Sequence, residues 1–348
     1  MGDRELIFNL GLSDLNVILE SAGESAFRAL QVWQGLYRSY WDSTENFSTL
    51  PHSLREKLQN DFLMTALQPV NLLESRNSET KKTLFRLRDG QSIEAVLMRY
   101  HKRRTLCIST QSGCPLGCVF CATGHMGFRR NLSSGEIIEQ VLYYARYLRG
   151  FGERVTNVVL MGMGEPFLNY EAVMSAIERL NHPKGFNLGA RRFTISTVGI
   201  VPAIKRFTDE ARQINLAVSL HAANDELRSS LLPVNRKYPL GDLIEICRYY
   251  VSKTNRRITF EWALVQDLND QVEQANQLAK LIQGMLCHVN VIPLNHTHRY
   301  SGKATSLARA RLFQRVLESN EIPCTIRLRR GIDIEAGCGQ LAIQKQND

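Results

Sequence analysis

The chain has 348 residues, of which 44% are hydrophobic and 22% are charged, and its formal net charge is +9 at pH 7. A chain of this length can form one large domain, or one domain with a smaller partner, around a substantial core. It has no apolar run of the ~20 residues that span a membrane, and its N-terminus lacks the regions of a signal peptide. We therefore expect a cytoplasmic globular protein that does not bind membranes.

The first 104 residues are predicted to form two segments. Residues 1–80 are interpreted as a small helical domain, because apolar side chains recur in them at helical spacing. Ser53 and Glu56 have the spacing of a capping box that would begin a helix. Residues 81–104 are interpreted as a β-hairpin linker, with two short strands around a turn at Asp89-Gly90.

Residues 105–348 alternate between apolar strands and amphipathic helices. Strands are expected at 105–110, 155–161, 192–197, 215–221, 257–265 and 288–294, with a last strand at 324–329. Helices are expected near 134–149, 170–181, 200–207, 241–252, 270–284 and 304–319. Six strand–helix units of this kind predict an α/β fold with a parallel sheet, either open or curled into a partial barrel.

Polar or glycine-containing segments follow five of these strands. They are 114–121, 162–166, 196–199, 219–221 and 293–295. Because the carboxyl ends of parallel strands meet at one edge, where such folds place their ligand sites, we expect one concave site there.

Three cysteines follow the first strand with the spacing Cys114-x3-Cys118-x2-Cys121. Thiolates are soft ligands that suit iron–sulfur clusters, and three of them leave one iron of a [4Fe-4S] cluster open for chemistry. The alternative is a structural zinc site with Cys107 as the fourth ligand. Cys107 lies within an apolar strand and no second Cys-x2-Cys pair follows, so the cluster is the favoured interpretation.

A second unusual cysteine lies near the C-terminus. Cys338 stands between Gly337 and Gly339, whereas Cys247 and Cys287 lie among apolar residues, as inert buried thiols do. The composition around Cys338 therefore predicts an accessible, reactive thiol.

The remaining candidate residues are weaker signals when each is taken alone. A Gly164-Glu165 pair is commonly part of a turn, but after a buried strand its backbone could approach a ligand and its carboxylate could accept from an ammonium. Each of four polar residues is most often a satisfied structural group, and together they suit the ribose and carboxylate of a bound nucleoside. These are Ser196, Ser219, His221 and Asn295.

Taken together, these motifs resemble the radical S-adenosylmethionine (SAM) superfamily and, more closely, its RlmN family. The resemblance covers essentially the whole chain and rests on the segments 114–132, 162–166, 195–199, 219–222, 287–295 and 336–341. It implies a partial (β/α)6 radical-SAM barrel with a small helical N-terminal domain that binds RNA. It also implies methylation of C2 of adenine 2503 in 23S rRNA and of adenine 37 in tRNA, with two SAM molecules per turnover.

The resemblance also implies roles for individual residues. Cys114, Cys118 and Cys121 would hold the [4Fe-4S] cluster. Cys338 would carry a methyl group as S-methylcysteine, and Cys107 would form a transient disulfide with it. The SAM site would comprise Gly164, Glu165, Ser196, Ser219, Leu220, His221 and Asn295, and Glu94 would be a proton acceptor.

Several partners and alternatives accompany this interpretation. Basic clusters at 102–104, 129–130, 191–192 and 327–330 suit the expected 23S rRNA and tRNA substrates, although a solvated basic surface has the same composition. We expect an electron donor such as flavodoxin and a monomeric chain.

The nearest alternative is a Cfr-type enzyme, which methylates C8 of the rRNA adenine and confers antibiotic resistance. A non-catalytic RNA-binding or zinc-stabilised protein is the alternative from another class.

Overall fold

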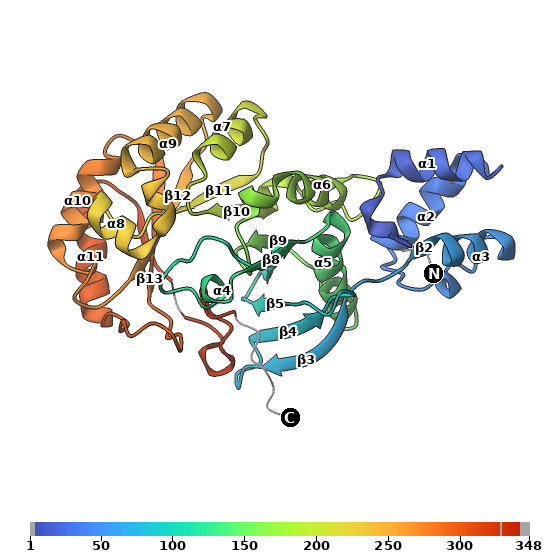
Figure 1. Ribbon diagram of the computed structural model, residues 1–348, viewed down its shortest axis with the longest axis horizontal. Helices are drawn as coiled ribbons and strands as arrows, with labels where there is room; N and C mark the ends of the chain where they lie inside the picture. The colour runs from blue at the N-terminus through green and yellow to red at the C-terminus, as the bar shows by residue number, and fades with distance from the viewer. Residues whose placement is uncertain (1–3, 328, 342–348) are drawn as a thin grey trace.

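The computed structural model describes residues 4–327 and 329–341. Within these residues one ten-stranded sheet has the order β14-β13-β12-β11-β10-β9-β6-β5-β4-β3. Its parallel part consists of β6 (Arg104–Cys107), β9 (Asn157–Leu160), β10 (Phe193–Thr197), β11 (Asn215–Ser219), β12 (Ile258–Leu264), β13 (Cys287–Pro293) and β14 (Cys324–Ile326). The sheet curls into an open barrel, with the intervening helices on its outer side (Figure 1).

The helices of the barrel match the six predicted amphipathic segments. They are α5 (Ser134–Arg149), α6 (Tyr170–Asn181), α7 (Val201–Asp209), α9 (Leu240–Thr254), α10 (Val272–Ile282) and α11 (Leu307–Ser319). Trp262 of β12 packs against Phe313 of α11, with 5.6 Å between the ring centroids. Since side chains alternate along a strand, Glu261 and Ala263 point to the opposite, concave side of the sheet.

The predicted hairpin is present as β4 (Thr80–Arg86) and β5 (Ser92–Arg99). Both strands belong to the barrel sheet, because β5 pairs antiparallel with β6 and places Val96 opposite Cys107. A strand that was not predicted, β3 (Gln68–Glu74), pairs with β4 at the edge. The sheet continues through residues 68–107 and so crosses both expected segment limits. The limits at residues 80 and 104 therefore stay a prediction.

The N-terminal helices α1 (Leu12–Ser21), α2 (Phe27–Tyr37) and α3 (His52–Asp61) lie beside α5 and α6 (Figure 1). Arg179 of α6 donates to the Phe8 carbonyl oxygen over 2.9 Å and so connects this unit to the barrel. The expected capping box is wrong. The helix begins at His52 directly after Pro51, so Ser53 already lies inside it and caps nothing.

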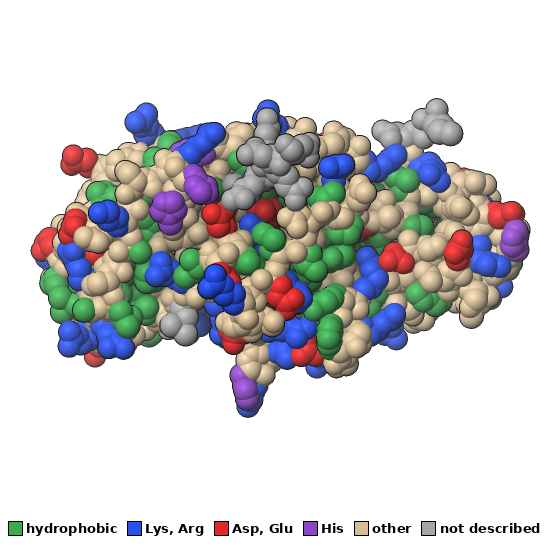
Figure 2. Space-filling view, turned by 90° about the horizontal axis from the view of Figure 1, so that it is seen from below, with side chains coloured by type: hydrophobic (Ala, Val, Ile, Leu, Met, Phe, Trp, Pro, Cys, Tyr) green, Lys and Arg blue, Asp and Glu red, His purple; other side chains and the backbone are tan. Residues whose placement is uncertain are grey.

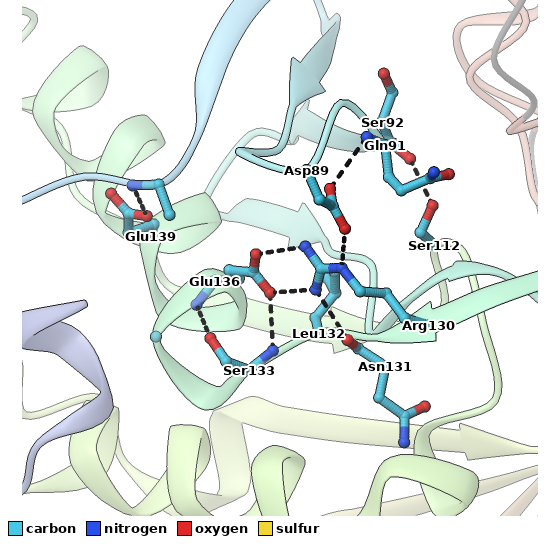
Figure 3. Close-up of polar contacts among 12 residues, drawn as sticks. Asp89, Gln91, Ser92, Ser112, Arg130, Asn131, Leu132, Ser133, Glu136 and Glu139 are labelled. Carbon is cyan, nitrogen blue, oxygen red and sulfur yellow. Dashed lines mark hydrogen bonds and ion pairs between the residues drawn. The ribbon is translucent and has the colours of Figure 1, made fainter. Parts of the chain in front are cut away.

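A short antiparallel ribbon holds both ends of the three-cysteine loop. It consists of β7 (Gln111–Gly113) and β8 (Phe128–Asn131). Arg130 of β8 donates from both terminal nitrogens to the Glu136 carboxylate at 2.8 Å and also pairs with Asp89 (Figure 3). Glu136 in turn caps α5 together with Ser133 (Figure 3). Arg130 therefore joins the ribbon, the hairpin turn and a barrel helix.

No helix among the described residues is long and apolar enough to cross a membrane.

Candidate active site

A cavity with about 170 Å³ of solvent-accessible space opens at the carboxyl ends of the parallel strands. The expected site residues that line it are Cys118, Cys121, Gly164, Glu165, Ser196, Ser219, His221, Asn295 and Cys338. The strand ends therefore bring together segments that are far apart in the sequence. Four expected residues are outside its lining, namely Glu94, Cys107, Cys114 and Leu220.

The three-cysteine loop has a backbone that only glycine permits at its start. Gly113 has φ +72°, and a Cβ there would lie 1.8 Å from the Gly127 carbonyl oxygen. The same oxygen accepts from the Cys114 N–H at 3.1 Å. This contact holds the two ends of the three-cysteine loop close together.

The thiols of Cys114, Cys118 and Cys121 lie near one another. Burial raises the pKa of Cys118 well above its usual value, and the two neighbouring thiols raise it further. No three His, Cys, Asp or Glu side chains of the described chain converge as ligands of a single metal ion would. In a [4Fe-4S] cluster each thiolate binds a different iron, and three neighbouring thiols on one loop are a ligand set that fits such a cluster.

Glu165 is a buried carboxylate held by backbone N–H groups at the cavity wall. Its two oxygens accept from the N–H groups of Phe167 at 3.1 Å and Val198 at 3.0 Å. Burial raises the pKa of Glu165 to about 7, although these hydrogen bonds oppose the rise. Gly164 has φ +98°, and a Cβ there would lie 2.5 Å from the Gln111 Cβ, so this turn requires glycine.

His221 is a hydrogen-bond donor and not a base in this environment. Its Nδ1 accepts from the Ala263 N–H at 2.9 Å, which leaves the proton on Nε2. Burial, with a contribution from Arg228, lowers the pKa of His221 to about 3. The ring also packs edge-on against Phe120, with 5.0 Å between centroids. The geometry favours the binding role over the catalytic one.

Two buried oxygen atoms at the cavity have no hydrogen-bond partner among the described residues. They are Asn295 Oδ1 and Glu261 Oε2. Buried acceptors of this kind are ordinarily satisfied, so they suit a ligand that carries N–H or O–H donors, as SAM does. Glu261 was missed by the sequence reasoning, and its one signal was a charged residue within the apolar strand ITFEWAL.

Leu220 is fully buried, and both of its backbone polar groups are bonded within the protein. Its N–H donates to the Glu261 carbonyl oxygen at 3.0 Å, and its carbonyl oxygen accepts from Arg228 Nε at 3.2 Å. Arg228 lies on α8 (Asp225–Leu231), a short helix that the sequence reasoning also missed.

The C-terminal loop is tied to the cavity on two sides. The Cys338 carbonyl oxygen accepts from Asn295 Nδ2 at 3.0 Å, beyond the end of β13. The Gly339 carbonyl oxygen accepts from the Ala122 N–H at 2.7 Å, directly after Cys121. These bonds hold Cys338 at the cavity, although Cys338 is exposed to solvent.

Cys107 and Cys338 are free thiols, and the Cys338 thiol acts electrostatically on Cys107. Burial raises the pKa of Cys107, the nearby Cys338 raises it further, and Cys107 therefore keeps its proton in this state. Glu94 is the diagonal neighbour of Cys107 on one face of β5 and β6, since Val96 is opposite Cys107. The Glu94 carboxylate forms a buried ion pair with Lys82, 3.2 Å from its Nζ.

The basic clusters divide into two groups by their place in the sheet. Cluster 102–104 ends at the first residue of β6 and cluster 191–192 directly precedes β10, so both lie at the amino ends of the strands, away from the cavity. Clusters 129–130 and 327–330 lie in β8 and after β14, on the cavity side, although Leu328 is outside the described residues. Lys and Arg side chains are distributed across the face shown in Figure 2 with acidic side chains among them, and form no continuous stripe.

Similar proteins are known for the whole chain. Residues 108–279 match a family model described as the Radical SAM superfamily, and residues 6–64 match the "Ribosomal RNA large subunit methyltransferase N-terminal domain". The chain is 45% identical over 342 residues to the "Probable dual-specificity RNA methyltransferase RlmN" of Geobacillus kaustophilus, covering 98% of this chain and 93% of the relative. It is 47% identical over 335 residues to the "Dual-specificity RNA methyltransferase RlmN 1" of Myxococcus xanthus, covering 96% and 93%.

A solved structure matches the fold over nearly the same length. The crystal structure of a radical SAM methyltransferase from Sphaerobacter thermophilus has a TM-score of 0.96 and 47% identity, covering 98% of this chain and 100% of that chain. This match includes the barrel and the N-terminal helices and confirms the predicted fold class.

Proposed function

The chain belongs to the RlmN family of radical SAM RNA methyltransferases, and we propose that it methylates C2 of adenine 2503 in 23S rRNA and of adenine 37 in tRNA. One observation carries the proposal. Cys338, the thiol proposed to carry the methyl group, lines the same cavity as Cys118 and Cys121, two of the proposed cluster ligands. The relatives named above support RNA as the substrate class.

The target atom explains why a radical route is needed. C2 of adenine is an electron-poor aromatic carbon with a C–H group of negligible acidity. A side-chain base cannot make such a carbon a nucleophile toward the SAM methyl group. Cys114, Cys118 and Cys121 would hold the cluster, which together with SAM would supply a radical able to take a hydrogen atom from the S-methyl group of Cys338. An electron donor such as flavodoxin would supply the electron.

The two reactive cysteines then complete the transfer. The methylene radical on Cys338 forms a carbon–carbon bond to C2 of the flipped-out adenine. C2 would then lose its proton, and the radical adduct would pass one electron to an acceptor, for which the proposed cluster, oxidised in the first step, is suited. Cys107, deprotonated by a nearby base, would attack Cys338 Sγ through its thiolate sulfur. The sulfur–carbon bond breaks, its electron pair and a proton complete the new methyl group, and a Cys107–Cys338 disulfide remains to be reduced.

Glu94 is proposed as the proton acceptor. Cys107 holds its proton before attack because burial raises its pKa, so a nearby base must remove that proton. Glu94 lies diagonally across the sheet from Cys107 on the same face and is outside the cavity lining. Cys107 would therefore relay protons between the cavity and the Glu94 carboxylate.

The remaining polar residues suit the binding of SAM. Glu165 would accept from the amino group of SAM, and the Nε2–H of His221 would donate to an oxygen of its ribose or carboxylate. The side chains of Ser196, Ser219 and Asn295 would contact its ribose and carboxylate, with Gly164 and Leu220 contributing backbone.

The proposal is tested by anaerobic reconstitution with iron, sulfide, SAM and a reductant, followed by incubation with unmodified 23S rRNA or tRNA. Nucleoside mass spectrometry is expected to find 2-methyladenosine. Peptide mass spectrometry of the enzyme is expected to find one additional CH2 group on Cys338, and the Cys338→Ala variant should form no methyladenosine. Detection of 8-methyladenosine would instead assign the chain to the Cfr-type reaction, and active enzyme without methylated Cys338 would contradict the mechanism.

A further inference from the structure

We propose that Arg228 is the buried counter-charge of the iron–sulfur cluster and raises the reduction potential of that cluster. The proposal rests on the cluster site at Cys114, Cys118 and Cys121 and adds a residue that no cysteine motif indicates.

Arg228 is a fully buried charge that lacks an ion-pair partner among the described residues. Its exposed fraction is 0%, and no carboxylate of the described residues lies within ion-pair distance of it. A guanidinium stays protonated at neutral pH even when burial, the main cause, lowers the pKa of Arg228 to about 10. Because burying an unpaired charge is costly, the site calls for an anion that the folded chain itself does not supply.

The hydrogen bonds of Arg228 orient its guanidinium without neutralising it. The acceptors are neutral oxygens: Leu220 O at 3.2 Å, Asn235 Oδ1 at 2.7 Å, Val198 O at 2.6 Å and Ser219 O at 3.3 Å. These bonds use four of the five N–H groups of a guanidinium. Arg228 therefore has no free pair of donors for a ligand carboxylate and acts as a fixed positive charge.

Asp225 is the carboxylate connected most directly to this charge, and it is exposed. Asn235 stands between the two residues, since its Nδ2 donates to Asp225 Oδ1 at 2.7 Å while its Oδ1 accepts from Arg228. Solvent screens the charge of an exposed carboxylate, so Asp225 compensates Arg228 only in part.

The cluster loop is the neighbour that would supply the missing negative charge. The Val119 N–H, between two of the cluster cysteines, donates to the Leu231 carbonyl oxygen of α8 at 3.1 Å. Val198 and Ser219, whose carbonyl oxygens accept from Arg228, line the same cavity as Cys118 and Cys121. A cluster bound at this loop carries negative charge that increases when it is reduced. A fixed cation in a medium of low dielectric constant therefore stabilises the reduced form and raises the potential.

The experiment compares reconstituted wild-type protein with Arg228→Lys, which keeps the charge, and Arg228→Met, which removes it. Arg179→Met is the matched control, because Arg179 is a half-buried arginine that donates to Phe8 O and Ser134 Oγ away from the cavity. Iron and sulfide content is measured first. An EPR-monitored redox titration without SAM then gives the midpoint potential, and a repeat with SAM separates any effect of the SAM carboxylate.

We expect Arg228→Met to hold about tenfold less reduced cluster at a fixed potential, equivalent to a midpoint about 59 mV lower for a one-electron couple. At the same potential, Arg228→Lys should hold an amount of reduced cluster within about threefold of wild type. Arg179→Met should hold the same amount as wild type. An Arg228→Met protein that holds its cluster and has the wild-type midpoint potential overturns the proposal. An Arg228→Lys protein whose midpoint potential is lowered as far as that of Arg228→Met also overturns it.

Other outcomes are also decisive. If Arg228→Met fails to fold or to hold the cluster, the Lys variant decides alone, because a wild-type midpoint supports the charge and a lowered midpoint contradicts it. If wild-type protein assembles no [4Fe-4S] cluster, the cluster site of the proposed function fails. A normal cluster with an unchanged potential in Arg228→Met refutes only the role of Arg228.

Discussion

At the scale of single residues, the site is distinguished by buried polar groups that the folded chain leaves incompletely compensated. Glu165 and Glu261 are carboxylates at the cavity whose pKa values are raised by burial. His221 is held neutral, and Arg228 has only neutral acceptors. Such groups lower the stability of the folded protein when no ligand is bound. Residues that are arranged to bind a ligand commonly have this property.

Glu165 gives the first prediction at this scale. Its pKa in the folded protein is about 7, above the value of an exposed glutamate, so folding binds a proton there. The stability due to this protonation is fully present below about pH 4.5 and is lost as the pH rises through 7. Glu165→Gln should therefore stabilise the cluster-free protein by about 1–3 kcal/mol more at pH 8 than at pH 5, relative to wild type.

Urea denaturation at the two pH values measures this difference. Glu171→Gln is the control, because Glu171 is exposed and its pairing with Arg206 lowers the pKa of its carboxyl. Its effect on unfolding should be the same at both pH values. A difference for Glu165→Gln that is also independent of pH would show that Glu165 is already ionised at pH 5.

At the scale of elements, the β7–β8 ribbon positions the cysteine loop. The two strands pair from Gln111 to Asn131, and Arg130 fixes the ribbon to the hairpin turn and to α5 (Figure 3). The loop can therefore present its thiols from a rigid base even though its own secondary structure is limited to α4 (Ala122–His125).

Gly113 and Gly117 provide a matched pair for testing this arrangement. Both have positive φ, but a Cβ at Gly113 would collide with the Gly127 carbonyl oxygen, whereas a Cβ at Gly117 meets nothing within 4 Å. Gly117→Ala should cost about 1–2 kcal/mol of stability from backbone strain alone. Gly113→Ala should cost more and should lower the iron bound per chain. Denaturation of the cluster-free proteins and iron analysis after reconstitution measure both effects, and equal losses in the two variants would contradict the proposed role of this contact.

At the scale of the whole molecule, one continuous sheet connects the reactive groups. The antiparallel strands β3–β5 extend the barrel sheet, so Glu94 on β5 lies beside Cys107 on β6. The C-terminal loop then crosses the carboxyl ends of the strands and brings Cys338 to the same region (Figure 1).

The position of the basic clusters relative to this sheet predicts which ones contact RNA. A target adenine must reach the cavity, so exposed Arg129 and Arg329 on the cavity side should contact phosphates. Arg129→Gln and Arg329→Gln should each weaken RNA binding several-fold and reduce the slope of log K against log salt by about one. Lys102→Gln and Arg192→Gln, exposed at the opposite ends of the strands, are the controls. Binding titrations at several salt concentrations test this, and equal slopes for all four variants would contradict it.

The order of strands and helices from residue 105 onward could be predicted from the sequence alone, because apolar runs and amphipathic periods are local properties. The cysteine spacing and the glycines around Cys338 likewise gave the cluster and reactive-thiol hypotheses without tertiary information. Short elements such as β7, β8 and α8 were missed, since so few residues show no clear period.

Only the tertiary structure decided which charges are compensated. Arg130 belongs to a basic pair in the sequence, yet it is fixed between Asp89 and Glu136. Arg228 has no comparable signal in the sequence, and it is buried without a carboxylate partner in the described part of the chain. The sequence by itself determined the α/β architecture, and it predicted the cluster-binding motif and the reactive thiol. The register of the sheet and the paths of the loops determined which groups meet at the cavity, because contacts between distant segments and the burial of charge depend on packing and not on local pattern.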